Sequence, residues 1–258
     1  MVEPRLSFGL DAQAYHRHRF AYPARLWEIL RGRCALGPGA RVFEVGAGTG
    51  IATGPLLASG AEVTAIEPDP RMAALLRQRL AEVTLQEAAF EEIALPPQSF
   101  DLGCAATSFH WVGPAGLNRV RAALRPGGWW AMWWNIHRAP GGEDAFSRAV
   151  QPHYDRLGVA EPSENSLPSQ MTWDGPLSAA GFHRITTERL PWEVTQRAEE
   201  IRALYATYSP IRILDEARRT ALLDAIAETV ERQFSGQVTR TYHTLVVTAQ
   251  LPSEGLSG

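Results

Sequence analysis

The nine residues from Val42 to Gly50, which read VFEVGAGTG, constrain the fold more than any other stretch of the chain. Their apolar first half, with Arg41 before it, predicts a short buried strand that ends at Val45, and the three alternating glycines predict a tight turn after it. Glycines in such a turn allow the backbone to bend sharply and to approach a ligand closely. A helix that begins near Thr49 would point its free N–H groups and the positive end of its dipole at that ligand. The stretch therefore predicts an α/β fold that binds a ligand at the end of its first strand.

Two acidic residues beside this turn indicate what kind of ligand it binds. Glu44 lies two residues before the turn, where its carboxylate would repel a pyrophosphate and favour a positively charged group. Glu67 ends the next apolar stretch and lies 19 positions after Gly48, where an acidic side chain can accept hydrogen bonds from both hydroxyls of a ribose. The dinucleotide fingerprint G-x-G-x-x-G requires a glycine at position 51, which is Ile51. These features argue against a nicotinamide dinucleotide as the ligand. The alternative to a ligand-binding loop is an ordinary glycine turn that binds nothing.

Hydrophobic periodicity predicts strands and helices in alternation along the rest of the chain. The expected strands are 41–45, 62–67, 83–86, 100–106, 129–135, 183–194 and 238–249, and the expected helices are 23–31, 49–60, 70 onward, 118–124, 198–208 and 215–234. Segment 136–180 contains several prolines and predicts one helix among loops. Four tryptophans between positions 129 and 134 indicate a buried strand, and the alternative is that two of them line a pocket.

Six short segments carry motifs that follow one another in a familiar order. They are Tyr15-x-x-x-Arg19-x-x-Tyr22-Pro23, the stretch 44–50, Glu67, the stretch 99–102, Ser108-x-His110-Trp111 and the stretch 124–128. In these segments the sequence resembles the class I S-adenosylmethionine-dependent methyltransferases, and within that family the enzymes that act on small molecules. The resemblance extends over nearly the whole chain.

The resemblance implies a Rossmann-like seven-stranded sheet, mostly parallel with a C-terminal antiparallel hairpin, flanked by helices and completed by a helical cap. We expect a single methyltransferase domain over residues 1–258. Its core would comprise about 34–135, 181–195 and 237–250, and its cap about 1–33, 136–180 and 196–236. A cap of this kind would shield the reaction from water and select the substrate.

The resemblance also implies S-adenosylmethionine as the cofactor and S-adenosylhomocysteine as its product. Glu44 would bind the cofactor's amino group or order its own loop, Glu67 would hold the ribose, and Arg19 or Tyr15 would reach the carboxylate. The full set of expected cofactor-binding residues is Tyr15, Arg19, Glu44, Gly46, Ala47, Gly48, Gly50, Glu67, Pro68, Met72, Ala89, Phe90 and Thr107.

Two of these contacts have alternatives. Met72 would place its thioether against a flat ring of the cofactor, or would simply belong to the core. Ala89 and Phe90 fall where the family contacts adenine, largely through the backbone. Many members of the family have an aspartate near this loop, and Glu87 is the residue that can replace it here.

Methyl transfer requires an electron pair in line with the S–CH3 bond, and holding the two reactants together supplies much of the acceleration. An oxygen nucleophile also benefits from a general base, for which histidine is suited near neutral pH. His110 is the first candidate and His137 the second, while Tyr15 or His153 would orient the substrate. The alternatives are that His110 is structural and that proximity alone drives catalysis. We expect transfer to oxygen of a phenol or carboxylate first, and to nitrogen or carbon next.

The amino-acid composition limits which binding partners and which cellular compartment we expect. A net charge of −3 gives no electrostatic footprint for nucleic acid, and no apolar run is long enough to span a membrane. Two distant cysteines and the lack of an apolar leader suit the cytoplasm. No histidine or cysteine spacing predicts a metal site, so the expected partner is a small-molecule acceptor and the protein a monomer or homodimer.

Two rival functions remain besides methyl transfer to a small molecule. The first is a fold relative that binds S-adenosylmethionine without transferring its methyl group, as a pericyclic catalyst or a regulatory binder. The second is the nicotinamide dehydrogenase, which both Glu44 and the glycine spacing oppose.

Overall fold

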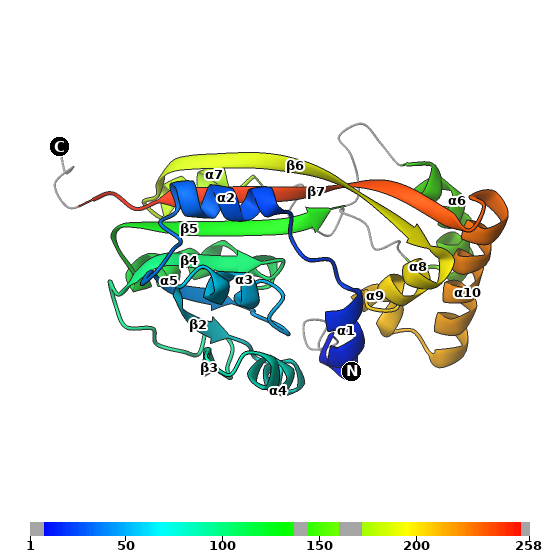
Figure 1. Cartoon of the computed structure of the whole chain (residues 1–258), viewed down its shortest axis with the longest axis horizontal. Coiled ribbons are helices and arrows are strands. Elements are labelled where there is room, and N and C mark those ends of the chain that lie inside the picture. The colour runs from blue at the N-terminus through cyan, green and yellow to red at the C-terminus, as the bar shows by residue number, and fades with distance from the viewer. Residues whose placement is uncertain (1–7, 137–143, 160–171, 254–258) are drawn as a thin grey trace. The chain divides into compact units, whose positions relative to one another are not determined.

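The computed structural model describes residues 8–136, 144–159 and 172–253. Within these ranges the strands form a seven-stranded sheet in the order β3-β2-β1-β4-β5-β7-β6, with helices beside it (Figure 1). The strands are β1 (Arg41–Val45), β2 (Glu62–Ile66), β3 (Thr84–Gln86), β4 (Phe100–Ala106), β5 (Leu124–Ile136), β6 (His183–Arg197) and β7 (Gln237–Gln250). The predicted fold, a Rossmann-like sheet with C-terminal antiparallel strands and flanking helices, is confirmed.

Helices separate β1 from β2, β2 from β3 and β4 from β5, and further helices lie between β5 and β7 in the sequence. The α-helices are α1 (Ala12–His18), α2 (Ala24–Arg33), α3 (Thr53–Ala58), α4 (Pro70–Arg79), α5 (Leu117–Ala123), α6 (Ala145–Leu157), α7 (Asp174–Ala179), α8 (Ala198–Tyr205), α9 (Ser209–Arg212) and α10 (Glu216–Gln233). Three short 3-10 helices are η2 (Phe8–Asp11), η3 (Phe109–Trp111) and η4 (Pro114–Gly116).

Strand β1 lies between β2 and β4 and runs parallel to both, with Val42 opposite Val63 on one side and Leu102 on the other. Strands β3 and β5 extend the parallel part of the sheet outward. Since parallel strands all point the same way, their carboxyl ends share one edge of the sheet, which is where open α/β sheets bind ligands. Val45, the last residue of β1, therefore leads the glycine turn into that edge.

Side chains of β1 alternate between two layers, as the pleat of a strand requires. Val42 packs in one buried cluster with Leu30 of α2 and Leu56 of α3, the two helices on the near side of the sheet in Figure 1. Phe43 points to the opposite side, where its ring stacks on that of Trp130 at 6.0 Å. The central strands are therefore covered on both faces.

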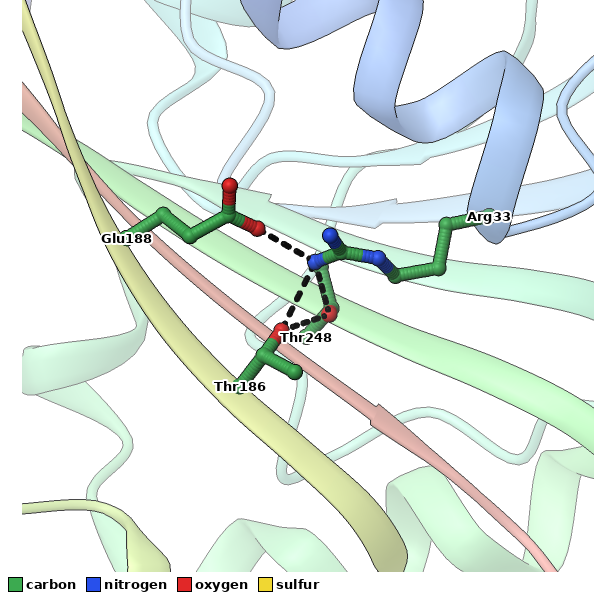
Figure 2. A network of polar contacts seen from close by, with 4 residues as sticks. All are labelled: Arg33, Thr186, Glu188 and Thr248. Carbon is green, nitrogen blue, oxygen red and sulfur yellow. Dashed lines mark hydrogen bonds and ion pairs between the residues drawn. The ribbon is translucent and has the colours of Figure 1, made fainter.

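A polar network joins α2 to the two outer strands (Figure 2). Nη1 of Arg33 donates to Oγ1 of Thr186 at 2.7 Å, to Oε1 of Glu188 at 2.5 Å and to Oγ1 of Thr248 at 3.2 Å. The two threonine hydroxyls also bond to each other at 2.7 Å. The network fixes the C-terminal turn of α2 against β6 and β7.

Strands β6 and β7 are antiparallel. The hydroxyl of Thr186 meets that of Thr248, and further along the hydroxyl of Thr195 meets that of Thr239 at 2.7 Å. The residue number rises on one strand as it falls on the other, which is the pairing expected of a C-terminal antiparallel pair.

The chain divides into two compact units, and β6 and β7 pass from one to the other along their length. The helical unit comprises the described parts of Met1–Phe20, Ile136–Leu167 and Pro191–His243, and the sheet unit comprises those of Ala21–Asn135, Pro168–Leu190 and Thr244–Gly258. Inside the helical unit α6, α8 and α10 share a core that includes Val150, Leu204 and Ile226. The division of residues 1–258 into the core and cap of one domain stays a prediction.

Several predicted elements differ in the structure. Strand β5 begins at Leu124, five residues before the expected start at 129. Helix α3 begins at Thr53, four residues later than expected, because Gly48 and Gly50 have positive φ angles of 60° and 89° that no α-helix contains. The helix expected over 198–208 ends at Tyr205, and α9 begins anew with Pro210 in its first turn, since proline cannot continue a helix.

Segment 136–180 contains two helices, α6 and α7, where one was expected. Asp144 caps α6 by accepting a hydrogen bond from the backbone N–H of Ser147 at 2.6 Å. The side chain of Leu177 in α7 is fully buried, and α7 belongs to the sheet unit. Pro176 does not prevent α7 from forming, because it lies within the first turn of that helix, where proline is tolerated.

Candidate functional site

The turn after β1 is closely surrounded by side chains, and its glycines are required there. A Cβ on Gly46 would lie 2.5 Å from Cβ of Ser108, and one on Gly50 would lie 2.6 Å from Cδ1 of Leu76. Both residues have positive φ angles, which residues with a Cβ rarely adopt. These glycines therefore let the turn pack closely against Ser108 and Leu76 and give the loop its shape at the carboxyl end of β1.

Glu44 is completely buried beneath this turn. Its Oε2 accepts a hydrogen bond from the hydroxyl of Thr53 at 2.6 Å, and Thr53 is the first residue of α3. Its Oε1 is buried and has no hydrogen-bond partner among the described residues. Burial raises the pKa of Glu44 to about 8, although the Thr53 hydroxyl opposes the shift. A buried acceptor atom left open in this way fits a ligand that carries an N–H donor or a positive charge.

Glu67 follows the end of β2 and is 7% exposed. Its Oε2 accepts the backbone N–H of Gly48 at 2.7 Å, and its Oε1 accepts that of Asp69 at 2.9 Å. Burial raises the pKa of Glu67 to about 7, against the lowering effect of these two hydrogen bonds. Glu67 therefore holds the glycine turn in shape, and each of its oxygens keeps a second lone pair for a ligand hydroxyl.

These two carboxylates influence each other, since the charge of Glu67 contributes to the raised pKa of Glu44. Neither forms an ion pair with an arginine in the part of the chain that the structure describes. Two buried acids without a basic partner are costly to keep ionised, and a cationic ligand beside them would reduce that cost. The local charge fits the sulfonium and ammonium groups of S-adenosylmethionine.

The loop after β4 lies beside the same turn. Thr107 has a positive φ of 58° and donates its backbone N–H to the carbonyl of Trp133 at 2.8 Å, while its hydroxyl meets that of Tyr22 at 3.1 Å. The hydroxyl of Ser108 donates to the carbonyl of Val45, the last residue of β1. These bonds hold the loop against β1 and β5.

His110, in η3, is half-buried in this loop. Nε1 of Trp134 donates to its Nδ1 at 3.4 Å, and its ring lies 4.8 Å from that of Trp111. Burial lowers the pKa of His110 to about 4. The imidazole is therefore neutral at pH 7.

Other predicted cofactor contacts lie around the turn or in the core of the sheet unit. Cε of Met72 lies 3.6 Å from where a Cβ on Gly48 would be, so the buried thioether is directly beneath the turn. The ring of Phe90 stacks on that of Phe43 at 6.3 Å, so only its backbone faces away from the core. Ala47 and Ala89 are buried, Pro68 is half-buried between Glu67 and the N-cap of α4, and Glu87 pairs with Arg77 at 3.1 Å.

Tyr15 and Arg19 belong to the helical unit and lie together there. The guanidinium of Arg19 lies 5.1 Å from the ring of Tyr15 and 4.4 Å from that of Tyr208, and its Nη2 donates to the carbonyl of Thr207 at 3.1 Å. No carboxylate pairs with Arg19 within the described ranges. His153 bonds to the hydroxyl of Thr229 at 2.9 Å in the same unit.

His137, the second catalytic candidate, lies outside the described residues. Three residues that support Glu44, the glycine turn and His110 were given no such role from the sequence: Thr53, Ser108 and Trp134. The motif Ser108-x-His110-Trp111 contained a signal for Ser108, whereas Thr53 and Trp134 contact Glu44 and His110 only through the fold.

The described residues contain neither a metal-binding cluster nor a membrane-spanning helix. They contain no group of three or more histidine, cysteine, aspartate and glutamate side chains that would hold a metal ion. They also contain no helix with the length and hydropathy needed to cross a bilayer.

Comparison with known proteins agrees with the fold. Residues 42–128 match a family model described as a methyltransferase domain. An uncharacterised methyltransferase of Mycobacterium tuberculosis is 32% identical over 215 residues, which cover 79% of this chain and 87% of that protein. A methyltransferase-like protein of Schizosaccharomyces pombe is 24% identical over 253 residues, or 95% of each chain.

Solved structures share the fold at lower identity. A structure described as a type II methyltransferase from Anaeromyxobacter dehalogenans has a TM-score of 0.66 at 20% identity and covers 91% of this chain and 99% of its own. Phosphoethanolamine N-methyltransferase 2 of Haemonchus contortus, solved with S-adenosylhomocysteine, has a TM-score of 0.60 at 15% identity over 98% of this chain and 61% of its own. With the identity to the mycobacterial relative, these findings show that the chain belongs to the class I S-adenosylmethionine-dependent methyltransferases.

Proposed function

We propose that this methyltransferase acts on a small molecule and transfers the methyl group to oxygen first, with nitrogen or carbon as the next choices. The observation that carries the cofactor part of the proposal is the buried pair Glu44 and Glu67, which has no basic partner among the described residues and lies beside the glycine turn. When bound, S-adenosylmethionine supplies an electrophilic methyl group on a positively charged sulfur. The acceptor's electron pair attacks that carbon in line with the C–S bond, whose electrons remain on sulfur.

The residues of the turn would bind the cofactor by charge and shape. Glu44 offers its open Oε1 to the amino group while its other oxygen orders α3 through Thr53. Glu67 uses its remaining lone pairs for the ribose hydroxyls, and Met72 lies against the bound molecule from beneath the turn. Arg19 has a guanidinium without a carboxylate partner in the described ranges, which suits a carboxylate of the cofactor.

On the acceptor side, His110 is the residue that we propose to contact the substrate. It follows β4 at the carboxyl edge of the sheet, which is the ligand edge of this fold class. The small net charge and the absence of a basic patch in the sequence favour a small molecule over nucleic acid. A monomer or a homodimer stays the prediction for the assembly.

The experiment that tests this function uses purified protein, methyl-labelled S-adenosylmethionine and a panel of carboxylic acids, phenols, amines and active-methylene compounds. We expect label in an oxygen acceptor and stoichiometric S-adenosylhomocysteine. The variant Glu67→Ala should lose cofactor binding, while Glu62→Ala, an exposed residue at the other end of β2, should retain it. Cofactor binding without transfer to any acceptor would support the non-transferring relative, and preference for NAD would support the dehydrogenase.

A further inference from the structure

We infer that Trp134 is a positioning residue that holds the hydrogen of His110 on Nε2, so that His110 meets the acceptor as a hydrogen-bond donor and the acceptor is a carboxylate. The part of this inference that concerns the acceptor rests on the proposed methyl transfer. The part that concerns the tautomer stands on the contacts of Trp134 alone.

The indole of Trp134 is firmly held in the sheet unit. The residue is 1% exposed, and its ring stacks on that of Trp173 at 6.2 Å with an angle of 14° between the planes. Its Nε1 reaches Nδ1 of His110 at 3.4 Å. An indole nitrogen only donates, so Nδ1 must be the acceptor and the neutral imidazole must have its hydrogen on Nε2.

This hydrogen bond distinguishes Trp134 from the three other tryptophans of the sheet unit that are buried to the same degree. Trp130, Trp133 and Trp173 are equally buried, and their Nε1 atoms have no acceptor among the described residues. The N–H of Trp134 thus differs from its neighbours in having a titratable partner, and that partner lies in the loop proposed to contact the acceptor.

The protonation state of His110 limits what it can do. Burial keeps the imidazole neutral at pH 7, and with its hydrogen on Nε2 and its Nδ1 lone pair engaged it has no free lone pair to accept a proton. No described residue bonds to Nε2, so this N–H is available to a ligand. His110 is therefore suited to donate to an oxygen and unsuited to serve as a general base.

An oxygen acceptor that needs no general base must arrive already ionised. A carboxylate does so at neutral pH: one oxygen attacks the methyl carbon, the C–S bond breaks with its electrons on sulfur, and the products are a methyl ester and S-adenosylhomocysteine. No proton has to leave. The Nε2–H of His110 would hold the second oxygen of the carboxylate and orient the first.

The tautomer is tested by ¹⁵N NMR of histidine-labelled protein without ligand, with the His110 signals assigned from His110→Gln. We expect a protonated Nε2 and an unprotonated Nδ1 in the wild type at neutral pH, and a mixture of both tautomers in Trp134→Phe. Trp130→Phe, a buried tryptophan of the same strand with no acceptor in the described ranges, should leave the pattern unchanged. A hydrogen on Nδ1 in the wild type would overturn the inference even if Trp134→Phe failed to fold.

The acceptor class is tested by comparing kcat/KM for matched carboxylic acids and phenols across pH. Carboxylates should be preferred, and Trp134→Phe should lower kcat/KM for them about 5-fold, as expected for one hydrogen bond, while cofactor affinity stays the same. Preference for phenols with a rate that rises as a base near neutral pH deprotonates would overturn the assignment. A protein that transfers no methyl group would refute the proposed function while the NMR result stood.

Discussion

In the sheet unit, Glu44 and Glu67 are buried as neighbouring acids without a basic partner among the described residues, whereas in the helical unit Arg240 is buried inside a nearly complete set of partners. Arg240 is 3% exposed and donates to Oδ2 of Asp144 at 2.7 Å, to the hydroxyl of Tyr205 at 2.9 Å and to that of Ser147 at 3.0 Å. Buried ionisable groups therefore have polar partners within the chain in the helical unit but lack a basic partner at the glycine turn of the sheet unit.

The pKa shifts express this difference. Although burial lowers the pKa of Arg240, the nearby Tyr205, Tyr242 and Asp144 raise it more, so the guanidinium stays charged. Burial raises the pKa values of Glu44 and Glu67 to about 8 and about 7, and their hydrogen bonds do not reverse it. A charge that serves the fold has its partners within the chain, while the pair at the glycine turn has no basic partner among the described residues, as we expect of a ligand site.

The largest expected effect is on the helical unit. Arg240→Met removes the cation and leaves Asp144, Tyr205 and Ser147 without their donor, so the free energy of unfolding should fall by about 2–4 kcal/mol. Urea denaturation followed by circular dichroism measures it. Arg232→Met, whose ion pair with Glu228 is exposed, is the control and should change stability by less than about 0.5 kcal/mol. Equal effects of the two substitutions would contradict the structural role of Arg240.

The next effect concerns the ligand side of the comparison. Glu67→Ala should weaken S-adenosylmethionine binding by about 1–3 kcal/mol, because charge-assisted hydrogen bonds to the ribose and the support of the Gly48 N–H are both lost. Isothermal titration calorimetry measures the dissociation constant, with Glu62→Ala as the matched control on the same strand. Unchanged affinity would exclude Glu67 from the cofactor site.

A smaller effect is expected on the pH dependence of stability in the ligand-free protein. The folded-state pKa values of Glu44 and Glu67, about 8 and about 7, lie above the ordinary 4.5, so the folded protein binds more protons between these limits. The stability from this source is fully present below pH 4.5 and is lost as pH rises through 7 and 8. Glu44→Gln keeps the shape and removes one titration, so its unfolding free energy should fall less steeply between about pH 5 and about pH 9.

Denaturant titrations at several pH values across that range, with Glu62→Gln alongside, measure the slope. The wild type and Glu62→Gln should share one slope, and Glu44→Gln should have a smaller one. Identical slopes in all three proteins would mean that Glu44 is ionised in the folded state, and the contrast with Arg240 would then disappear.

The smallest effect is expected at the Arg33 network. Arg33 has partners within the chain, as Arg240 does, but it is partly exposed to solvent. The side chains of Arg33 and Glu188 are 32% and 35% exposed, so solvent screens their ion pair. Arg33→Met should therefore destabilise the fold by only about 1 kcal/mol, mainly through the bonds to Thr186 and Thr248 in Figure 2. Arg25→Met, in the exposed pair with Glu28 on the same helix, is the control in the same urea denaturation series. A loss as large as that of Arg240→Met would show that exposure does not separate the two networks.

Much of the fold could be predicted from local patterns. Strands β1 and β4 begin and end at the predicted residues, because apolar runs bounded by turns define a buried strand. Helix α4 begins at the predicted place since Asp69 caps it and Pro70 follows. The late start of α3 and the two helices between 136 and 180 were not predicted, because they depend on backbone angles at glycines and on burial rather than on periodicity.

The candidate site also contains features that could be predicted from the sequence and features that could not. Glu44 lies near the end of β1 and Glu67 follows β2, and these two strand ends meet at one edge, so their proximity to the glycine turn was predictable from strand order. The bonds from Thr53 to Glu44, from Ser108 to Val45 and from Trp134 to His110 join residues whose distance depends on packing. The sequence shows which residues can donate or accept a hydrogen bond, but it does not show which donor meets which acceptor.

The strand order has a consequence for biosynthesis. β7 is the last strand in the sequence, yet it lies between β5 and β6, which are both made before it. Until residues 237–250 have left the ribosome, β5 and β6 each keep an open hydrogen-bonding edge, and such edges recruit foreign strands. The nascent chain therefore carries these two open strand edges until β7 is synthesised.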